Sequence, residues 1–325
     1  MTRDFRLFDL HCDTLTEAEK WGLGLVNREL MLSLDALPDA AGWCQCFAIF
    51  IPDSLRGPAA ADYYRRVVRF WHSQLAAHAG RLVQLHNAAE PAALPCGRVG
   101  GLLTVEGGAV LGGRLDLIEE LRRDGVRALT LTWNGANELG SGCETEEGLT
   151  PFGRRAVAAL EQAGIAVDVS HLNDAGFRDL CAAAKRPFLA THSNARSICP
   201  VPRNLADWQI CEIRDRGGII GFNFIESFLA GPGQAPDFEA ARRHLEHFLS
   251  LGCERCLAIG TDYDGGAVSP QFDRPAKLED FYQYLLGCGF DEAFCRGLFF
   301  ENARRFCAAL PLGGAAGSET ISATR

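Results

Sequence analysis

The sequence alternates short β-rich runs with helical patterns, and this alternation constrains the fold more than any other feature. Several of the β-rich runs are continuously apolar, as is typical of parallel strands buried on both faces. Strands that alternate with helices indicate βαβ units, and eight such units predict an α/β fold, a closed (β/α)8 TIM barrel. The expected strands span residues 5–13, 43–51, 99–107, 126–133, 164–171, 187–193, 218–225 and 256–265.

An open, doubly wound sheet is the main alternative arrangement. Its nucleotide-binding versions carry a glycine fingerprint after the first strand, and this chain has none there. One helical pattern has clear boundaries, with Thr150 as the expected N-cap, Pro151 in the first turn and Gly164 at the end. The expected helices span residues 60–80, 114–125, 150–164, 172–184, 204–218, 237–252 and 278–289.

The length and composition fit one domain with a large core. The chain has 325 residues, of which 47% are hydrophobic, so we expect a single catalytic barrel over residues 1–310. Residues 311–325 are small and polar, and we expect a flexible tail there. The formal net charge of −9 argues against binding to nucleic acid or to an anionic membrane, since both require a basic surface.

The start of the chain and its cysteines bear on location. The first four residues lead directly into the first expected strand, which leaves no room for a signal peptide, and no apolar run is long enough to span a bilayer. We therefore expect a cytoplasmic protein whose thirteen cysteines are free thiols. Cys253 and Cys256 have the spacing of a zinc knuckle, but the absence of a second CxxC pair favours structural thiols.

Metal-capable side chains fall at the carboxyl ends of the expected strands, where the chemistry of a parallel barrel gathers. Three of the eight histidines meet this positional test, and carboxylates stand at matching strand ends. A single histidine at a strand end is usually structural, but a set of this kind favours a metal site. The set consists of His11, Asp13, Glu106, His171, His192, Asp262 and Asp264, although Asp264 also fits a plain turn residue before glycine.

Spacing predicts how these side chains could cooperate. Residues two apart in a strand point to the same side, so His11 and Asp13 can bind one ion together. Glu106 has two carboxylate oxygens and could bridge that ion to a second one held by His171 and His192. Imidazole and carboxylate ligands suit Zn²⁺ and would also accept Mn²⁺ or Fe²⁺. Two such ions, about 3.5–4 Å apart, would convert a bridging water into hydroxide at neutral pH.

Short segments from residue 9 to residue 265 follow one another in the order "DLHCD", "TVEGG", "LTLT" before "NGAN", "GLTPFG", "DVSH", "THSNAR" with "PRN", and "GTDYDG". Taken together, these segments resemble the membrane (renal) dipeptidase family, peptidases of the metal-dependent amidohydrolase superfamily. No single segment is specific, but their combination and order are. The 21-residue step from His171 to His192 also fits the family pattern.

The resemblance implies a role for each matching residue. One zinc would be held by His11 and Asp13 and the other by His171 and His192, with Glu106 as the bridging ligand. Asp262 would carry the protons of the bridging water and of the leaving amine, and Arg203 would bind the terminal carboxylate of the substrate. The implied enzyme is a binuclear zinc dipeptidase that cleaves small dipeptides with a metal-bridging hydroxide. The relatives also imply tolerance for a D-residue on the C-terminal side, and a homodimer.

One departure from the family pattern concerns the substrate pocket. The renal enzyme has a histidine after "LTLT" that contacts the substrate carbonyl, whereas this chain has Trp133. Indole donates one hydrogen bond but accepts none, so Asn134 and Asn137 are the candidates for the missing polar contact. Two alternatives therefore stay open: an amidohydrolase that acts on a lactam, lactone or other acyl bond, and a catalytically weakened metal-binding homologue.

Overall fold

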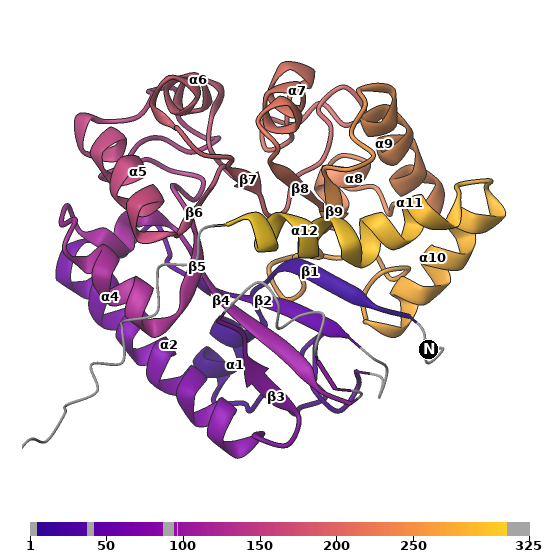
Figure 1. Ribbon diagram of the computed structural model, residues 1–325, viewed down its shortest axis with the longest axis horizontal. Helices are drawn as coiled ribbons and strands as arrows, with labels where there is room; N and C mark the ends of the chain where they lie inside the picture. Colours follow the sequence, from indigo (N-terminus) through magenta and orange to yellow (C-terminus); the bar gives the residue numbers. More distant parts are fainter. Residues whose placement is uncertain (1–4, 38–41, 87–93, 96, 311–325) are drawn as a thin grey trace, which may run out of the picture.

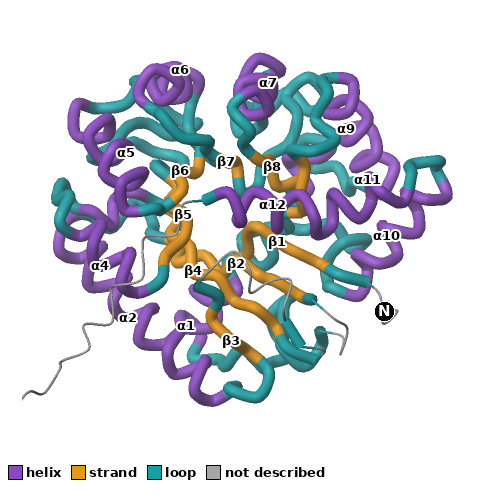
Figure 2. Tube along the Cα trace, in the orientation of Figure 1, coloured by secondary structure: helices purple, strands orange, loops and turns teal. Residues whose placement is uncertain are grey.

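A closed barrel of parallel strands forms the centre of the molecule (Figures 1 and 2). The computed structural model describes residues 5–37, 42–86, 94–95 and 97–310, so the expected tail at 311–325 lies outside the described residues. Nine strands form one sheet, and without β3 the remaining eight close into a ring in which β1 pairs with β9 and β2 pairs with β4. The predicted (β/α)8 TIM barrel is confirmed.

The strands form where the apolar runs lie. All six residues of β1 and all eight of β4 are buried, as expected for strands covered by helices on one side and by the barrel core on the other. The strands are β1 (Leu7–Cys12), β2 (Trp43–Phe50), β3 (Leu82–Gln84), β4 (Val99–Glu106), β5 (Val126–Thr130), β6 (Ala166–Asp168), β7 (Leu189–Ala190), β8 (Ile219–Phe222) and β9 (Leu257–Ile259).

The helices surround this ring (Figure 1). Thr150 caps α5 by accepting a hydrogen bond from the backbone of Gly153, and Gly164 ends that helix in the left-handed conformation, as predicted. The helices are α1 (Thr14–Trp21), α2 (Gly57–Ala77), α4 (Leu117–Asp124), α5 (Pro151–Ala163), α6 (Asp174–Ala183), α7 (Asp207–Asp215), α8 (Glu226–Leu229), α9 (Phe238–Ser250), α10 (Ala276–Gly287), α11 (Glu292–Arg296) and α12 (Asn302–Ala309), with short turns η1 (Gly108–Leu111) and η2 (Gly297–Glu301).

The structure adds elements that the sequence analysis did not predict. Strand β3 pairs with Val99–Gly101 of β4, whose later residues from Leu103 pair with β5. Helices α1, α8, α11 and α12 were also not predicted. Helix α12 lies across the barrel in Figure 1, and Phe306 together with Phe300 of η2 packs against residues near the amino ends of the strands, such as Phe8. The amino end of the barrel is therefore covered.

Two further observations complete the fold. None of the described helices is long and apolar enough to cross a membrane. The cysteines within the described residues are free, as predicted, and both Cys253 and Cys256 are buried.

Candidate metal centre and active site

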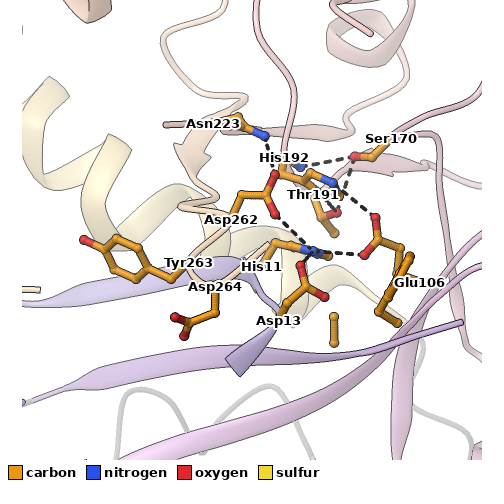
Figure 3. A network of polar contacts seen from close by, with 12 residues as sticks. His11, Asp13, Glu106, Ser170, Thr191, His192, Asn223, Asp262, Tyr263 and Asp264 are labelled. Atoms are coloured by element: carbon orange, nitrogen blue, oxygen red, sulfur yellow. Dashed lines mark hydrogen bonds and ion pairs between the residues drawn. The ribbon is translucent and has the colours of Figure 1, made fainter. Parts of the chain in front are cut away.

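The predicted metal ligands converge at the carboxyl end of the barrel. Figure 3 labels four of them, His11, Asp13, Glu106 and His192. His11 lies in β1, Asp13 follows directly as the N-cap residue of α1, and Glu106 is the last residue of β4. His171 and His192 stand a few residues beyond β6 and β7. All five side chains are buried, so segments far apart in the sequence meet in one enclosed site.

Glu106 lies at the centre of this cluster. Its Oε2 is 3.4 Å from His11 Nε2, whereas its Oε1 is 2.8 Å from His171 Nε2 and 3.5 Å from His192 Nε2. The two histidine nitrogens on the second side are 3.0 Å apart. One carboxylate oxygen thus faces His11 and the other faces His171 and His192, as a bridging ligand requires, and the His11 ring stacks on the His192 ring at 3.7 Å between centroids.

The donor atoms fit divalent cations. Two sets of three residues have ligand atoms within 4.8 Å of one another, namely His11 with Glu106 and His192, and His11 with Asp13 and Asp262. His11 Nε2 and Asp13 Oδ1 are buried without a hydrogen-bond partner. Burying such polar atoms unpaired is costly, and a bound cation would satisfy both of them.

The electrostatics of the cluster point the same way. Burial lowers the pKa of His11, but Glu106 and Asp13 outweigh burial and raise this pKa well above its usual value. Burial and the nearby Glu106 raise the pKa of Asp13 to about 7. Burial lowers the pKa of His171 and that of His192, so both rings favour the neutral form that binds metals. Carboxylates that attract a proton to His11 would equally attract a divalent ion.

The outer nitrogen of His171 is held by a neighbouring side chain. His171 Nδ1 lies 2.7 Å from Asn134 Oδ1, which can only accept, so the ring donates from Nδ1 and turns the Nε2 lone pair inward. Asn134 is itself oriented because its Nδ2 donates to Glu144 Oε1 at 3.2 Å. Asn134 thus contacts a predicted metal ligand and also lines the cavity above it.

A cavity of about 220 Å³ opens over the cluster. Trp133 forms part of its wall, with its ring 5.1 Å from Phe50 and 6.2 Å from His171 between centroids. The cavity is lined by Asp13, Glu17, Phe50, Glu106, Trp133, Asn134, His171, Ile225, Phe228, Asp262, Asp264 and Gly265.

Asn137 lies elsewhere. It is not among the residues that line this cavity, and its amide is engaged by the backbone of its own loop. Asn137 Nδ2 donates to Leu131 O at 2.9 Å, and its Oδ1 accepts from the N–H groups of Leu139 and Gly140. The side chain that could have replaced the family histidine therefore stabilises the loop after β5 instead.

Arg203 is buried next to the cluster. Its Nη2 donates to His192 O at 2.8 Å and its Nη1 to Ser193 Oγ at 3.0 Å, and its guanidinium lies over the Phe228 ring at 5.5 Å. These bonds use two of the five N–H groups of an arginine, and Nε is buried without a partner. Arg203 is not among the residues that line the cavity, whereas its neighbour Phe228 is.

Asp262 and Asp264 differ in what their carboxylates do. Asp262 Oδ1 faces the cluster, 3.8 Å from His11 Nε2, while its Oδ2 accepts from Asn223 Nδ2 at 2.8 Å. Asp264 accepts from Thr14 Oγ1 at 2.5 Å and from the backbone of Met31, which ties two loops together. His171, Asp262 and Asp264 all have positive φ, a conformation that costs energy outside glycine and gathers at functional sites.

Two buried carboxylates, Asp9 and Asp168, had no predicted role. The sequence does mark them, because each interrupts an apolar strand, in "LFDL" and "VDVS", and a carboxylate buried there needs hydrogen-bond partners.

Comparison with known proteins agrees with this geometry. The family model of the membrane dipeptidases (peptidase family M19) matches residues 1–310. An uncharacterized protein in the pqqA 5′ region of Klebsiella pneumoniae is 32% identical over 242 residues, which cover 70% of this chain and 89% of that protein.

Solved structures are similar over almost the whole chain. A metallopeptidase from Rhodobacter sphaeroides, crystallised with a phosphinate mimic of the dipeptide L-Ala-D-Ala, is 28% identical, with a TM-score of 0.89 over 94% of this chain and 99% of that one. A second crystal structure, of the family M19 metallopeptidase called dipeptidase AC, is also 28% identical, with a TM-score of 0.88 over 94% of this chain and 98% of that one.

Proposed function

Because this chain belongs to the membrane dipeptidase family, peptidase family M19, we propose that it is a binuclear zinc dipeptidase that cleaves small dipeptides. The observation that carries this proposal is the position of Glu106, whose Oε2 faces His11 while its Oε1 faces His171 and His192. One ion would be bound by His11 and Asp13 and the other by His171 and His192, with Glu106 shared between them.

The ions, when bound, would supply the Lewis acidity that turns a bridging water into the hydroxide nucleophile and polarises the scissile carbonyl. Asp262 is the candidate proton carrier. Its Oδ1 faces the cluster while Asn223 holds its Oδ2, so the carboxylate is fixed with one free oxygen at the floor of the cavity. This oxygen could accept the proton of the attacking water and deliver it to the leaving amine. A side chain at Gly265 would collide with Asp262 and Asp13, so glycine keeps this space open.

Arg203 is the candidate for recognition of the substrate carboxylate. Three of its five N–H groups remain available after its bonds to His192 and Ser193. A planar guanidinium suits bidentate binding of a carboxylate, which predicts a requirement for a free C-terminus. Because Phe228, which contacts the guanidinium, lines the cavity and Arg203 does not, we expect this role to require a shift of Phe228 when the substrate binds.

The size of the cavity supports a small substrate, and the metallopeptidase from Rhodobacter sphaeroides carries a mimic of L-Ala-D-Ala. We propose that the present chain also cleaves L,D-dipeptides. Trp133 closes one wall with an indole where the family has an imidazole, and Asn134 is oriented toward His171. A carbonyl contact would then depend on the Trp133 N–H group.

The decisive experiment is a kinetic screen of L,L- and L,D-dipeptides with metal content measured on the same preparation. The proposal expects two divalent ions per chain and hydrolysis of free dipeptides, with amidated dipeptides cleaved much more slowly. Lactones and cyclic amides belong in the same panel, because preferential cleavage of either would favour the amidohydrolase alternative. Two bound ions with no turnover of any acyl substrate would favour the weakened homologue. The cytoplasmic location and the homodimer stay predictions.

A further inference from the structure

Asp9 and Asp168 occupy equivalent places on opposite sides of the barrel. Asp9 lies in β1 and Asp168 in β6, and both side chains are shielded from solvent. In the ring β1-β2-β4-β5-β6-β7-β8-β9, strand β6 is the fourth strand from β1 in either direction. The two carboxylates are therefore diametrically opposed, and a buried carboxylate must be matched by hydrogen-bond donors.

Asp9 ties three neighbouring strands together. Its Oδ1 accepts from His11 N at 3.2 Å, two residues along its own strand, and from Thr261 N at 2.9 Å, just beyond β9. Its Oδ2 accepts from Thr261 Oγ1 at 2.7 Å and from Gln45 Nε2 of β2 at 2.8 Å.

Asp168 has partners of the same kind in mirrored order, because its threonine follows the next strand of the ring, β7, whereas the threonine of Asp9 follows the preceding strand, β9. Its Oδ1 accepts from Ser170 N at 3.0 Å, again two residues along, and from Thr191 N at 2.9 Å, just beyond β7. Its Oδ2 accepts from Thr191 Oγ1 at 2.6 Å and from Thr130 Oγ1 of β5 at 2.6 Å. Each carboxylate thus accepts four hydrogen bonds, and in both cases two of them come from a single threonine.

Those two threonines stand directly before site residues. Thr261 precedes Asp262, the candidate proton carrier, and Thr191 precedes the predicted ligand His192. Thr191 also contacts the ligand side chain directly, because its Oγ1 lies 2.8 Å from His192 Nδ1 (Figure 3 shows both residues). The only hydroxyl proton of Thr191 is donated to Asp168, so the ring must donate from Nδ1 and present the Nε2 lone pair to the metal site.

We propose that Asp9 and Asp168 are paired positioning residues. Each accepts hydrogen bonds from three neighbouring strands and, through a threonine, positions one functional side chain of the site. Asp168 acts through Thr191 on the tautomer and orientation of His192, whereas Asp9 acts through Thr261 on the position of Asp262. The proposal rests on the proposed binuclear function. Partners of this kind, one shell outside the ligands, typically change metal affinity by about 10- to 100-fold.

Thr191→Val and Thr261→Val form a matched pair for the test. Both replace a buried hydroxyl with a methyl group and remove one bond to an aspartate. Thr191 also loses its contact with the imidazole of His192, whereas Thr261 also loses contacts with the backbone of His11 and Tyr263 but touches no ligand ring. Titration of metal-free protein with Co²⁺ reports on each site separately from turnover. We expect Thr191→Val to weaken the binding of one of the two ions by about 10- to 100-fold. Thr261→Val should retain both Co²⁺ affinities and lower kcat, and serine at either position should restore the wild-type value.

Proton NMR provides a second readout that is independent of metal binding. The wild-type protein should show a protected imidazole N–H resonance from His192 Nδ1, which Thr191→Ser and Thr261→Val retain and Thr191→Val loses. If Thr191→Val does not fold, the wild-type spectrum alone tests the proposal. A proton on His192 Nδ1 in the metal-free protein would support the proposal, and a proton on Nε2 would overturn it.

The remaining outcomes separate this inference from the proposed function. Equal losses of stability in both valine variants, with Co²⁺ affinities and kcat unchanged, would mean that the two aspartates only hold strands together, and this would overturn the inference. A wild-type protein that binds fewer than two Co²⁺ ions would instead contradict the binuclear centre, whatever the NMR resonance shows.

Discussion

Asp262→Asn isolates proton transfer from metal binding. Asparagine has the same shape, and the contact with Asn223 Nδ2, 2.8 Å in the wild type, survives if the new amide turns its oxygen toward Asn223. Its NH2 group then occupies the place of Oδ1, which faces the cluster 3.8 Å from His11 Nε2. A group that accepts a proton is replaced there by one that can only donate.

The expected loss follows from that exchange. General acid–base catalysis by one positioned side chain contributes about 10²- to 10⁴-fold, so kcat should fall by that factor, which corresponds to about 3–5 kcal/mol of activation free energy. Metal content, measured on the same sample, should remain at two ions per chain. The assay is initial-rate hydrolysis of the best dipeptide with inductively coupled plasma analysis of bound metal.

Asp264→Asn is the matched control. Asp264 stands two residues away with the same positive φ, but its oxygens accept from Thr14 and Met31. One amide oxygen cannot replace both, so this variant should lose about 1–3 kcal/mol of stability and far less kcat than Asp262→Asn. An Asp262→Asn enzyme with both metals and wild-type kcat would refute the proton-transfer role, and loss of one ion would show that Asp262 is a metal ligand.

Three further predictions concern the ligands, the substrate and pH. Glu106→Gln removes the negative charge that lies between His11 on one side and His171 on the other, so metal analysis should find fewer than two ions per chain. Retention of both ions would contradict the bridging role. Arg203→Lys keeps the charge but loses the planar fork, so KM for free dipeptides should rise about tenfold while the slow cleavage of amidated dipeptides changes little; equal changes for both would exclude carboxylate binding. His244 is buried, and burial lowers its pKa from 6.5 to about 4. Its Nδ1 accepts from Ala195 N and its Nε2 donates to Leu229 O, so the folded state resists a proton that the unfolded chain accepts. The folded state should therefore lose up to about 3 kcal/mol of stability as the pH falls from 6.5 toward 4. The urea midpoint of His244→Gln should depend less steeply on pH than that of the wild type. An identical slope would contradict the role of His244 in this pH dependence.

The sequence predicts well where local patterns carry the information. Continuous apolar runs identify the barrel strands, and Thr150 with Gly164 marks both ends of α5 because capping depends on a few adjacent residues. The three residues of β3 are too few to show a period, and they form a strand only because the first residues of β4 are free on that edge.

In the site, too, local patterns are predictable and contacts that depend on the fold are not. The HxD pair and the strand-end positions predict that His11 and Glu106 meet, since any parallel barrel brings its carboxyl ends together. They do not predict that Asn137 turns to its own backbone while Asn134 holds His171, because those choices depend on the path of the loop after β5. The buried Asp9 and Asp168 are visible in the sequence, but their partners come from strands that only the closed ring brings into contact.

The covered end of the barrel has a consequence for turnover. Phe306 and Phe300 pack against the strand starts, and the cavity over the metal cluster lies at the other end. We therefore expect substrate and products to share the opening of that cavity. Both amino acids released from a dipeptide must leave by the opening through which the next dipeptide arrives. Free amino acids should accordingly act as competitive inhibitors, and the product that retains the original carboxylate should be the stronger one.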